Sequence, residues 1–301
     1  MRLDTFKNIT RLAVCCLVVA LLCGIGLYIR DYYSAPPKSE SAVKVAHLSI
    51  DDVMAFDDLI NNGDSYESLF DHPLFAFLYD LHRRYGAVFT LYTYETFGDN
   101  GSNIASVPLK FRDDFRRAAP WLRIGFHWVA TEFNADISVQ DFQSAYGNVN
   151  RSVCKFANST MMADVLRLHD FYSADSLTGV LDGTRVLLCA DRPGRRSYTL
   201  DDNECQYVSD GHQLVKDGIR YLRTDLRTEY RYDIDMALRH IQDRDTLVIF
   251  THEWALTPQS VTDILGRMWH KRKLRVNSLS RRNLETTVKW LNDNGYRFSF
   301  L

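Results

Sequence analysis

The sequence predicts an α/β protein built on a complete or broken (β/α) barrel, and three observations support this fold class. Short apolar runs rich in β-branched and aromatic residues recur along the chain, and Asp245–Thr251 is the clearest of them. Segments with apolar residues at helical spacing alternate with these runs. Roughly seven or eight strand candidates over about 260 residues fit a single domain of mostly parallel strands. No internal repeat or second linker interrupts residues 44–301, so we predict one domain there.

The first half of this domain shows both patterns in turn. Tyr66–Tyr85 carries apolar residues at helical spacing, and Gly86 follows it as a helix C-cap would. Ala87–Tyr94 is β-branched and aromatic, as expected of a strand. By the same criteria, the predicted strands of this half are Val45–Ile50, Ala87–Tyr94, Leu122–Trp128 and Asp164–His169, and the predicted helices are Tyr66–Tyr85, Phe111–Ala119 and Val139–Phe156.

The second half continues the alternation. Leu284–Asn294 is amphipathic, and Gly295 ends it before a last short apolar run. The predicted strands here are Thr184–Ala190, Ile219–Asp225, Asp245–Thr251 and Tyr296–Leu301, and the predicted helices are Asp233–Gln242 and Leu284–Asn294.

Composition excludes some classes of partner. The net charge of -2 and the pI near 6.5 give no reason to expect nucleic acid or an acidic polymer. Aromatic residues make up 13% of the chain, which suits a well-filled core and equally a cleft that stacks sugars on rings. Composition alone does not choose between these two.

The N-terminus predicts a membrane anchor. Leu12–Ile29 is free of charged residues, and it is near the lower length for a membrane-spanning helix. Arg2, Lys7 and Arg11 precede it, so residues 1–11 are expected in the cytoplasm. A cleavable signal peptide is the alternative, but the run ends in bulky residues rather than small ones. We therefore expect a single-pass signal anchor at 12–29, an exposed linker at 30–43, and an extracytoplasmic domain in the periplasm or at the cell surface.

Cysteine spacing gives little support to a structural zinc site. Outside the predicted anchor only Cys154, Cys189 and Cys205 remain, and they show no CxxC spacing. A disulfide between Cys189 and Cys205 is an open alternative in an oxidising compartment.

Four apolar runs end in residues that bind metals or move protons. They are the segments ending at Asp51-Asp52, at His127, at Arg167-Leu-His169 and at His252. Because the carboxyl ends of buried parallel strands gather at one rim, we expect these side chains to meet there. Paired carboxylates with histidines predict a hydrolytic metal site. The structural alternative is that the aspartates cap a helix and the histidines are satisfied core residues.

The first two of these segments resemble motifs of the NodB-type polysaccharide deacetylases. Leu48-Ser-Ile-Asp51-Asp52 resembles the Thr-Phe-Asp-Asp motif, which implies that Asp51 is the general base and Asp52 a metal ligand. Phe126-His127-Trp128 supplies the first histidine of a His-Ser/Thr-x-x-His motif, which implies a second ligand at His127. Thr131 stands where the motif has its second histidine.

This departure leaves three alternatives for the third metal ligand. His169 supplies it from the next strand end, Glu132 or water completes a weaker site, or the metal is lost. We favour His169, because a catalytic zinc typically has three protein ligands.

The later motifs of the family have weaker counterparts. The resemblance implies that Arg167 braces Asp51 and that Phe171 or Tyr172 forms a wall of the groove. Asp225 lies where the family has an aspartate-containing motif, and we predict a catalytic role for it. The alternative for Asp225 is an exposed edge strand with solvated ion pairs.

The last motif of the family places a histidine after an apolar strand near the C-terminus. Leu247-Val-Ile-Phe-Thr-His252 matches it, which implies that His252 is the general acid, tuned by Glu253 or Asp225. Trp254 and Trp128 suit sugar stacking, and the alternative for a tryptophan at such a place is the core.

Together the resemblance implies a hydrolase that depends on a divalent metal, expected to be zinc. Its reaction would remove N- or O-acetyl groups from a cell-envelope or surface glycan. One alternative is a non-catalytic glycan-binding protein on the same fold. Another is a metal-dependent nucleotide-sugar transferase that uses Asp51 and Asp52 as its cation site, which leaves the histidines unexplained.

Overall fold

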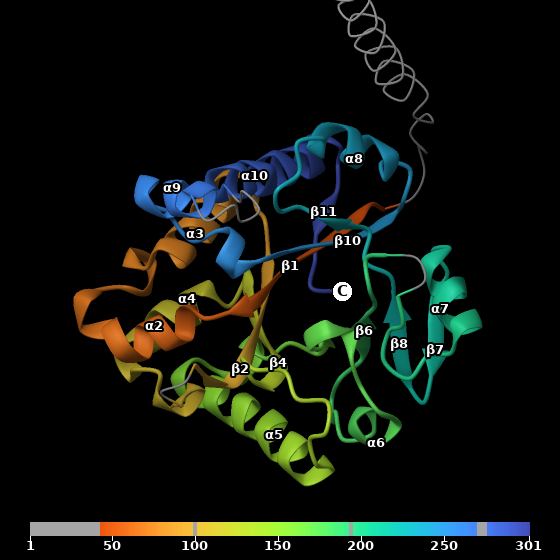
Figure 1. The fold of residues 1–301 in the computed structure, drawn as a ribbon, viewed down its shortest axis with the longest axis horizontal. Coiled ribbons are helices and arrows are strands. Elements are labelled where there is room, and N and C mark those ends of the chain that lie inside the picture. The colour runs from red at the N-terminus through yellow and green to blue at the C-terminus, as the bar shows by residue number, and fades with distance from the viewer. Residues whose placement is uncertain (1–42, 99–100, 193–194, 270–275) are drawn as a thin grey trace, which may run out of the picture.

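Strands and helices alternate along the computed structural model, which describes residues 43–98, 101–192, 195–269 and 276–301 (Figure 1). The strands are β1 (Val45–Val53), β2 (Phe89–Phe97), β3 (Ser102–Asn103), β4 (Leu122–Ala130), β5 (Val165–Leu166), β6 (Val186–Leu188), β7 (Leu214–Lys216), β8 (Ile219–Leu222), β9 (Leu226–Arg227), β10 (Thr246–His252) and β11 (Arg297–Phe298). The helices are α2 (Ala55–Asn62), α3 (Pro73–Tyr85), α4 (Arg112–Ala118), α5 (Val139–Phe156), α6 (Asp175–Thr178), α7 (Asp202–Ser209), α8 (Ile234–His240), α9 (Val261–Trp269) and α10 (Asn277–Asp293). Seven short 3₁₀ turns complete the described part: η1 (Gly63–Ser65), η2 (Leu69–Asp71), η3 (Ile104–Ser106), η4 (Leu109–Phe111), η5 (Ser159–Met161), η6 (His169–Phe171) and η7 (Glu253–Ala255).

Two mostly parallel sheets hold these strands. The larger runs in the order β3-β2-β1-β10-β9, with β4 beside β2 and β11 beside the start of β1. The smaller runs in the order β5-β6-β8-β7, and one bridge between Ile124 and Met162 links the two sheets. No ladder joins β8 to β9 in the described part of the chain, so the strands do not close into a barrel. The predicted α/β class with a parallel sheet is confirmed, in an open arrangement.

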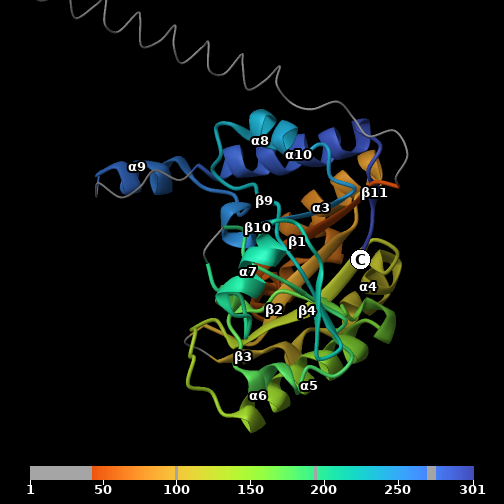
Figure 2. The same ribbon diagram turned by 90° about the vertical axis from the view of Figure 1, so that its right-hand side faces the viewer.

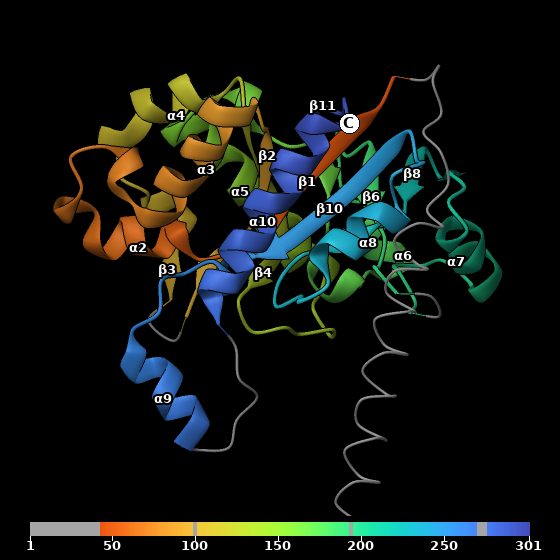
Figure 3. The same cartoon turned by 90° about the horizontal axis from the view of Figure 1, so that it is seen from above.

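Helices cover the larger sheet on both sides and leave one rim to the loops. Figure 2 shows α3, α8 and α10 on one side of the sheet, α5 and α6 on the other, and α9 standing away from the body. Figure 3 shows α10 lying across β1 and β10. Because β1, β2, β4 and β10 run parallel, their carboxyl ends share one rim, where Asp51 and His252 are direct partners across the β1–β10 pair. The predicted gathering of strand ends is therefore present.

Several predicted elements differ in length, for local reasons. The predicted helix Tyr66–Tyr85 begins only at Pro73, because Ser68 and Asp71 form a capping box around η2 and Pro73 opens the next helix. Gly86 ends it with a φ of 70°, a left-handed value that favours glycine. The predicted strand Asp164–His169 is only two residues long, and His169 lies in η6 beyond its end.

The structure does not describe most of the N-terminal region, but it describes three of the cysteines. The predicted cytoplasmic segment, anchor and linker lie outside the described residues, except for the last linker residue. No helix in the described part is long and apolar enough to cross a membrane. Cys154, Cys189 and Cys205 are free thiols, with Cys189 buried.

Gly125 is required where β4 passes between the two sheets. A Cβ atom there would lie 2.9 Å from Leu166 Cδ2 and from two ring carbons of Tyr92, and both side chains are fully buried. Because such a core cannot absorb the overlap without moving, Gly125→Ala should lower the free energy of unfolding by about 1–3 kcal/mol. Urea denaturation of the full-length variants measures this change.

The control for Gly125 is Gly147→Ala in α5. Its added Cβ would approach only the end of the flexible Arg151 side chain, and alanine has the higher helix propensity. This control should be at least as stable as the wild type. Equal stability of the two variants would contradict the assigned packing of Gly125.

Candidate metal centre and active site

A backbone irregularity in β1 brings two adjacent carboxylates to the same site. Neighbouring residues in a regular strand point to opposite faces. Asp52 instead has a φ of 55°, and the pairing of β1 with β2 shifts register between Ile50 and Val53. As a result both Asp51 and Asp52 lie close enough to His127 to affect its charge.

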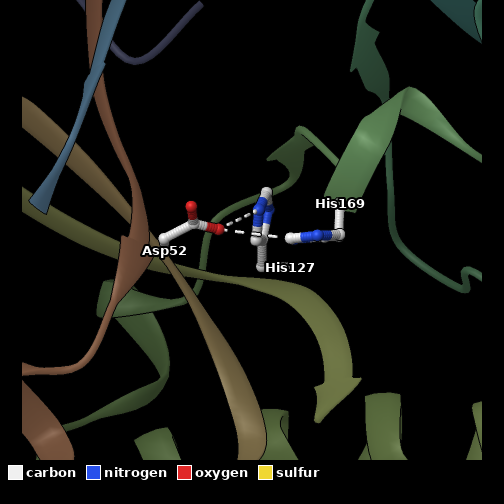
Figure 4. A group of neighbouring side chains, drawn as sticks. All are labelled: Asp52, His127 and His169. Carbon is white, nitrogen blue, oxygen red and sulfur yellow. Dashed lines mark ion pairs between the residues drawn. The ribbon is translucent and has the colours of Figure 1, made fainter. Parts of the chain in front are cut away.

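Asp52, His127 and His169 form a group that can hold a metal ion. Each offers one ligand atom, and these atoms lie within 4.8 Å of one another. Oδ1 of Asp52 lies 3.2 Å from Nε2 of His127 and 3.3 Å from Nδ1 of His169. Figure 4 shows the two rings converging on this carboxylate from the sides of β4 and η6. Among the described residues, this is the group with such geometry.

The electrostatics of this group suit a cation. Burial alone would raise the pKa of Asp52, but hydrogen bonds from His127 and His169, together with the charges of His127 and His252, hold that pKa well below its usual range. Burial lowers the pKa of His127, and the two aspartates outweigh it and raise that pKa above its usual value. A carboxylate that stays ionised beside two imidazoles is a donor set that zinc and similar divalent cations accept.

The buried ring of His127 is oriented for coordination. Its Nδ1 lies 2.6 Å from the carbonyl oxygen of Arg167, to which it donates in the neutral tautomer. Nε2 is then left with its lone pair facing Asp52. Metal-binding histidines are commonly held by such a second hydrogen bond, which fixes both tautomer and ring orientation.

Thr131 does not take part in this group. Its hydroxyl accepts a hydrogen bond from the backbone N–H of Gly98 at 3.2 Å, in the loop after β2. Glu132 is exposed. The third ligand candidate beside Asp52 and His127 is therefore His169, the residue named in the first of the three alternatives.

Two residues that hold Asp52 add to the predicted set. The hydroxyl of Tyr94, which the sequence analysis missed, donates to Asp52 Oδ1 at 2.5 Å and lies 3.1 Å from His169 Nδ1. Trp254 donates from Nε1 to Asp52 Oδ2 at 2.9 Å. The signal available for Tyr94 was its place near the end of β2, next to β1. Trp254 was predicted to contact sugar, and its indole nitrogen contacts a metal-ligand candidate.

Arg167 lies where the sequence predicted it. Its Nη1 donates to both oxygens of Asp51, at 3.0 and 3.3 Å, and to Oγ of Ser49 at 2.6 Å. Its Nη2 donates to Thr224, and the guanidinium lies 4.2 Å from the ring centre of Phe250. Both members of this ion pair are almost fully buried, so removal of either leaves an uncompensated charge in the interior.

His252 has a carboxylate partner, and that partner is Glu229. Nδ1 of His252 lies 2.9 Å from Oε1 of Glu229, while Nε2 lies 3.7 Å from Asp52 Oδ2. Burial would raise the pKa of Glu229, but its hydrogen bonds with His252 and Arg227 outweigh it and lower that pKa. Glu229 therefore remains ionised and orients the His252 ring, with Nε2 toward Asp52.

Asp225, predicted to be catalytic, is not brought to this site. It precedes β9, and its carboxylate accepts from Arg223 at 2.8 Å, from Arg244, and from the Val248 N–H at 2.8 Å. Val248 lies four residues before His252 on β10, which places Asp225 about 13 Å back along the strands from the rim. Its surroundings are those of a structural ion-pair network.

Glu253 does not tune His252 either. Its Oε2 accepts from the backbone N–H groups of Met54 and Ala55, at 2.5 and 2.9 Å, at the start of α2. Burial raises the pKa of this carboxyl to about 7 from its usual 4.5. An acid whose folded pKa is raised stabilises the fold below its unfolded pKa, and this stability is lost as pH rises through the folded pKa.

Glu253→Gln should therefore be more stable than the wild type above pH 7. A neutral amide oxygen keeps both hydrogen bonds without a buried charge, and the gain at pH 8 should be about 2–3 kcal/mol. Near pH 4 the two proteins should unfold with the same free energy. Urea denaturation at pH 4, 6 and 8 measures this difference. Glu67→Gln, at an exposed position, is the control, and a gain of the same size there would contradict the assignment.

The predicted sugar-binding aromatic residues fall into two groups. Trp128 follows His127 in the strand and is buried against Phe133, Phe142 and Tyr172. It is therefore a core residue. Tyr172 is half-buried and packs against Phe133, whose ring is stacked on His169 at 5.5 Å. Trp254 stacks on His252 with ring centres 4.9 Å apart.

Comparison with known proteins finds similarity at the level of three-dimensional structure. No family model and no curated protein matches this chain. The Xyl-CE4 domain of a multidomain xylanase from the hindgut metagenome of Trinervitermes trinervoides aligns at 12% identity, with 85% of this chain and 87% of that chain covered and a TM-score of 0.45. A peptidoglycan deacetylase from Bacillus subtilis aligns at 13% identity, with the same coverage and a TM-score of 0.42.

A third similar structure is a family 4 acetyl xylan esterase from Clostridium thermocellum in complex with a cobalt ion. It aligns at 12% identity and a TM-score of 0.42, with 85% of this chain and 87% of that chain covered. All three alignments are at 12–13% identity and describe a similarity of fold.

Proposed function

We propose that this protein is a metal-dependent deacetylase that removes N- or O-acetyl groups from a cell-envelope or surface glycan. The observation that carries the proposal is the meeting of three units at one rim. They are the metal-ligand group Asp52–His127–His169, the buried pair Asp51–Arg167, and the pair His252–Glu229. Hydrolysis of an acetyl group needs a Lewis acid, a base for the attacking water and an acid for the leaving group, and these units supply residues for each.

The metal-ligand group would hold a divalent cation, and zinc fits its donors. Such a cation polarises a carbonyl group and makes water a stronger acid. Asp51 then takes the proton of the attacking water. Arg167 donates to both oxygens of that carboxylate and holds it in place, so its position does not depend on the substrate.

His252 would donate a proton to the leaving amine or alcohol. Its Nε2 faces Asp52 while Glu229 holds the opposite nitrogen, so one imidazole edge is directed at the reacting group.

The glycan would lie between two aromatic walls. Phe133 and Tyr172 stand beside His169, and Trp254 stacks on His252 from the other side. Aromatic rings that flank a polar site offer flat apolar faces to sugar rings while the polar groups fix orientation.

Release of acetate from acetylated glycans by the purified full-length protein tests the proposal. We expect activity that a chelator abolishes and zinc restores, with one bound metal ion per chain by elemental analysis. If the protein binds acetylated oligosaccharide but binds no metal and releases no acetate, it would instead be the non-catalytic glycan-binding protein. Binding of uridine nucleotides without acetate release would favour the nucleotide-sugar transferase.

We also propose that residues 12–29 anchor the catalytic domain to the membrane with the domain outside the cytoplasm. The uncharged run and the positive residues before it support this. Protease treatment of spheroplasts or intact cells should digest the domain and leave a short membrane-bound fragment. Release of the intact domain into the medium would show that a signal peptide is cleaved instead.

A further inference from the structure

A cavity opens at the same rim, beside His169, and it includes Asp170 in its lining. Its volume is about 560 Å³, and it lies between the loop that follows β5 and the loop that follows β6. The residues that matter for its chemistry are Asp170, Tyr172, Arg195, Arg196 and Tyr198. None of the proposed catalytic steps uses this cavity.

Aromatic rings connect the cavity with the metal-ligand group. Tyr172 lines the cavity and packs edge-on against Phe133, with ring centres 5.4 Å apart. Phe133 in turn is stacked on His169. Tyr172 therefore lines the cavity and also contacts the ring that stacks on a metal-ligand candidate.

The walls of the cavity are held in a conformation that L-amino acids rarely adopt. Asp170, Phe171 and Tyr198 have φ values of 55°, 56° and 54°. The N–H of Tyr198 donates to the carbonyl oxygen of Phe171 at 2.7 Å, which ties the two loops together. Strained backbone of this kind concentrates at ligand sites, where it lowers stability but fixes the shape of the binding site.

The lining carries an excess of positive charge. Two arginines and one aspartate give +2 and -1, a net charge of +1. Arg195 pairs with Asp170, which is 57% exposed, so water screens this pair and it is weak. The guanidinium also lies 5.1 Å from the ring centre of Phe171, which holds it at the cavity wall.

Arg196 has spare donors. Its Nε donates to the carbonyl oxygen of Leu200 at 3.3 Å, and the two terminal nitrogens have no hydrogen-bond partner among the described residues. A guanidinium presents its donors in a planar fork that matches a carboxylate or phosphate.

We propose that this cavity binds a negatively charged group of the glycan, a carboxylate or a phosphate, on a sugar next to the acetylated one. This inference rests on the proposed function, which identifies the ligand as an acetylated glycan. The overall charge of -2 gave no reason to expect an acidic ligand. At contact distance, however, the local excess of positive charge at the cavity matters more than the net charge of the whole chain, because salt screens distant charges.

Calorimetric titration of the full-length Asp51→Asn variant with three acetylated tetrasaccharides tests the proposal. One is neutral, one carries a hexuronate carboxylate and one a phosphodiester. Because a hydrogen-bonded charge pair changes affinity substantially, at least one acidic sugar should bind about tenfold more tightly than the neutral one. Which of the two binds more tightly identifies the source of the charge.

Arg195→Gln and Arg196→Gln should each reduce this preference, and the double variant should abolish it. Arg192→Gln is the matched control, because Arg192 is an exposed arginine of the same segment that does not line the cavity. Equal affinity for acidic and neutral sugars, or an equal effect of all three variants, would overturn the proposal. Arginine-dependent binding without acetate release from the wild type would keep the subsite and refute the deacetylase.

Discussion

Asp51→Asn should lower the rate of acetate release by a factor of about 10²–10⁴ while the protein stays folded. The asparagine side chain has nearly the same size but cannot accept a proton from water. Asp51 is also the only one of the two adjacent carboxylates held by an arginine, since Asp52 is surrounded by imidazole, indole and hydroxyl groups. Acetate release from an acetylated oligosaccharide measures the change.

Three controls separate a chemical role of Asp51 from a structural one. The variant leaves Arg167 without its counter-ion, so circular dichroism and urea denaturation must show that it is folded at the assay temperature. Its bound metal should be unchanged, because Asp51 is not in the ligand group. Ser49→Ala removes only a hydroxyl that accepts from Arg167, and it should keep most of the activity. A folded, metal-loaded Asp51→Asn variant with near-native turnover would refute the role of Asp51.

Strand ends made much of this site predictable. Asp51, Asp52, His127 and His252 each follow a long apolar run, and parallel pairing then requires these ends to meet. Asp225 shows where this argument fails. The predicted strand Ile219–Asp225 ends at Leu222, as β8. Asp225 lies just before β9, a separate strand in the other sheet whose carboxyl end is at Arg227. The carboxylate at the rim is therefore Glu229 and not Asp225.

Side-chain direction explains the other differences. His127 faces Asp52, whereas its neighbour Trp128 is 1% exposed and belongs to the core. The pairing of β4 with β2 shifts register between Phe126 and Trp128. Neighbouring residues of a strand normally point to opposite faces. Asp51 and Asp52 both lie at the site because Asp52 has a left-handed backbone conformation, which no sequence pattern predicts. Tyr94 reaches Asp52 from a neighbouring strand, and the register that places it there depends on the whole sheet.

His169→Ala should lower the affinity for zinc by more than about 100-fold. Loss of a hydrogen-bond partner of a ligand typically costs about 10- to 100-fold, and loss of a ligand should cost more. The reason lies in the donor count, because the described residues offer one carboxylate and two imidazoles at this place. Competition with a chromophoric chelator measures the affinity. His240→Ala, which removes a surface histidine bonded to its own helix, should bind zinc as the wild type does.

Thr131→His tests whether a histidine at position 131 can serve as a metal ligand. The hydroxyl of Thr131 contacts the Gly98 backbone and not the metal-ligand group, so a histidine there would have to turn away from the loop to coordinate. We therefore expect Thr131→His to leave zinc affinity unchanged in the wild-type background and not to rescue His169→Ala. Rescue would show that a histidine at position 131 can reach the metal-ligand group. Unchanged affinity in His169→Ala alone would instead mean that Tyr94 or water replaces the imidazole, and that His169 is not the third ligand.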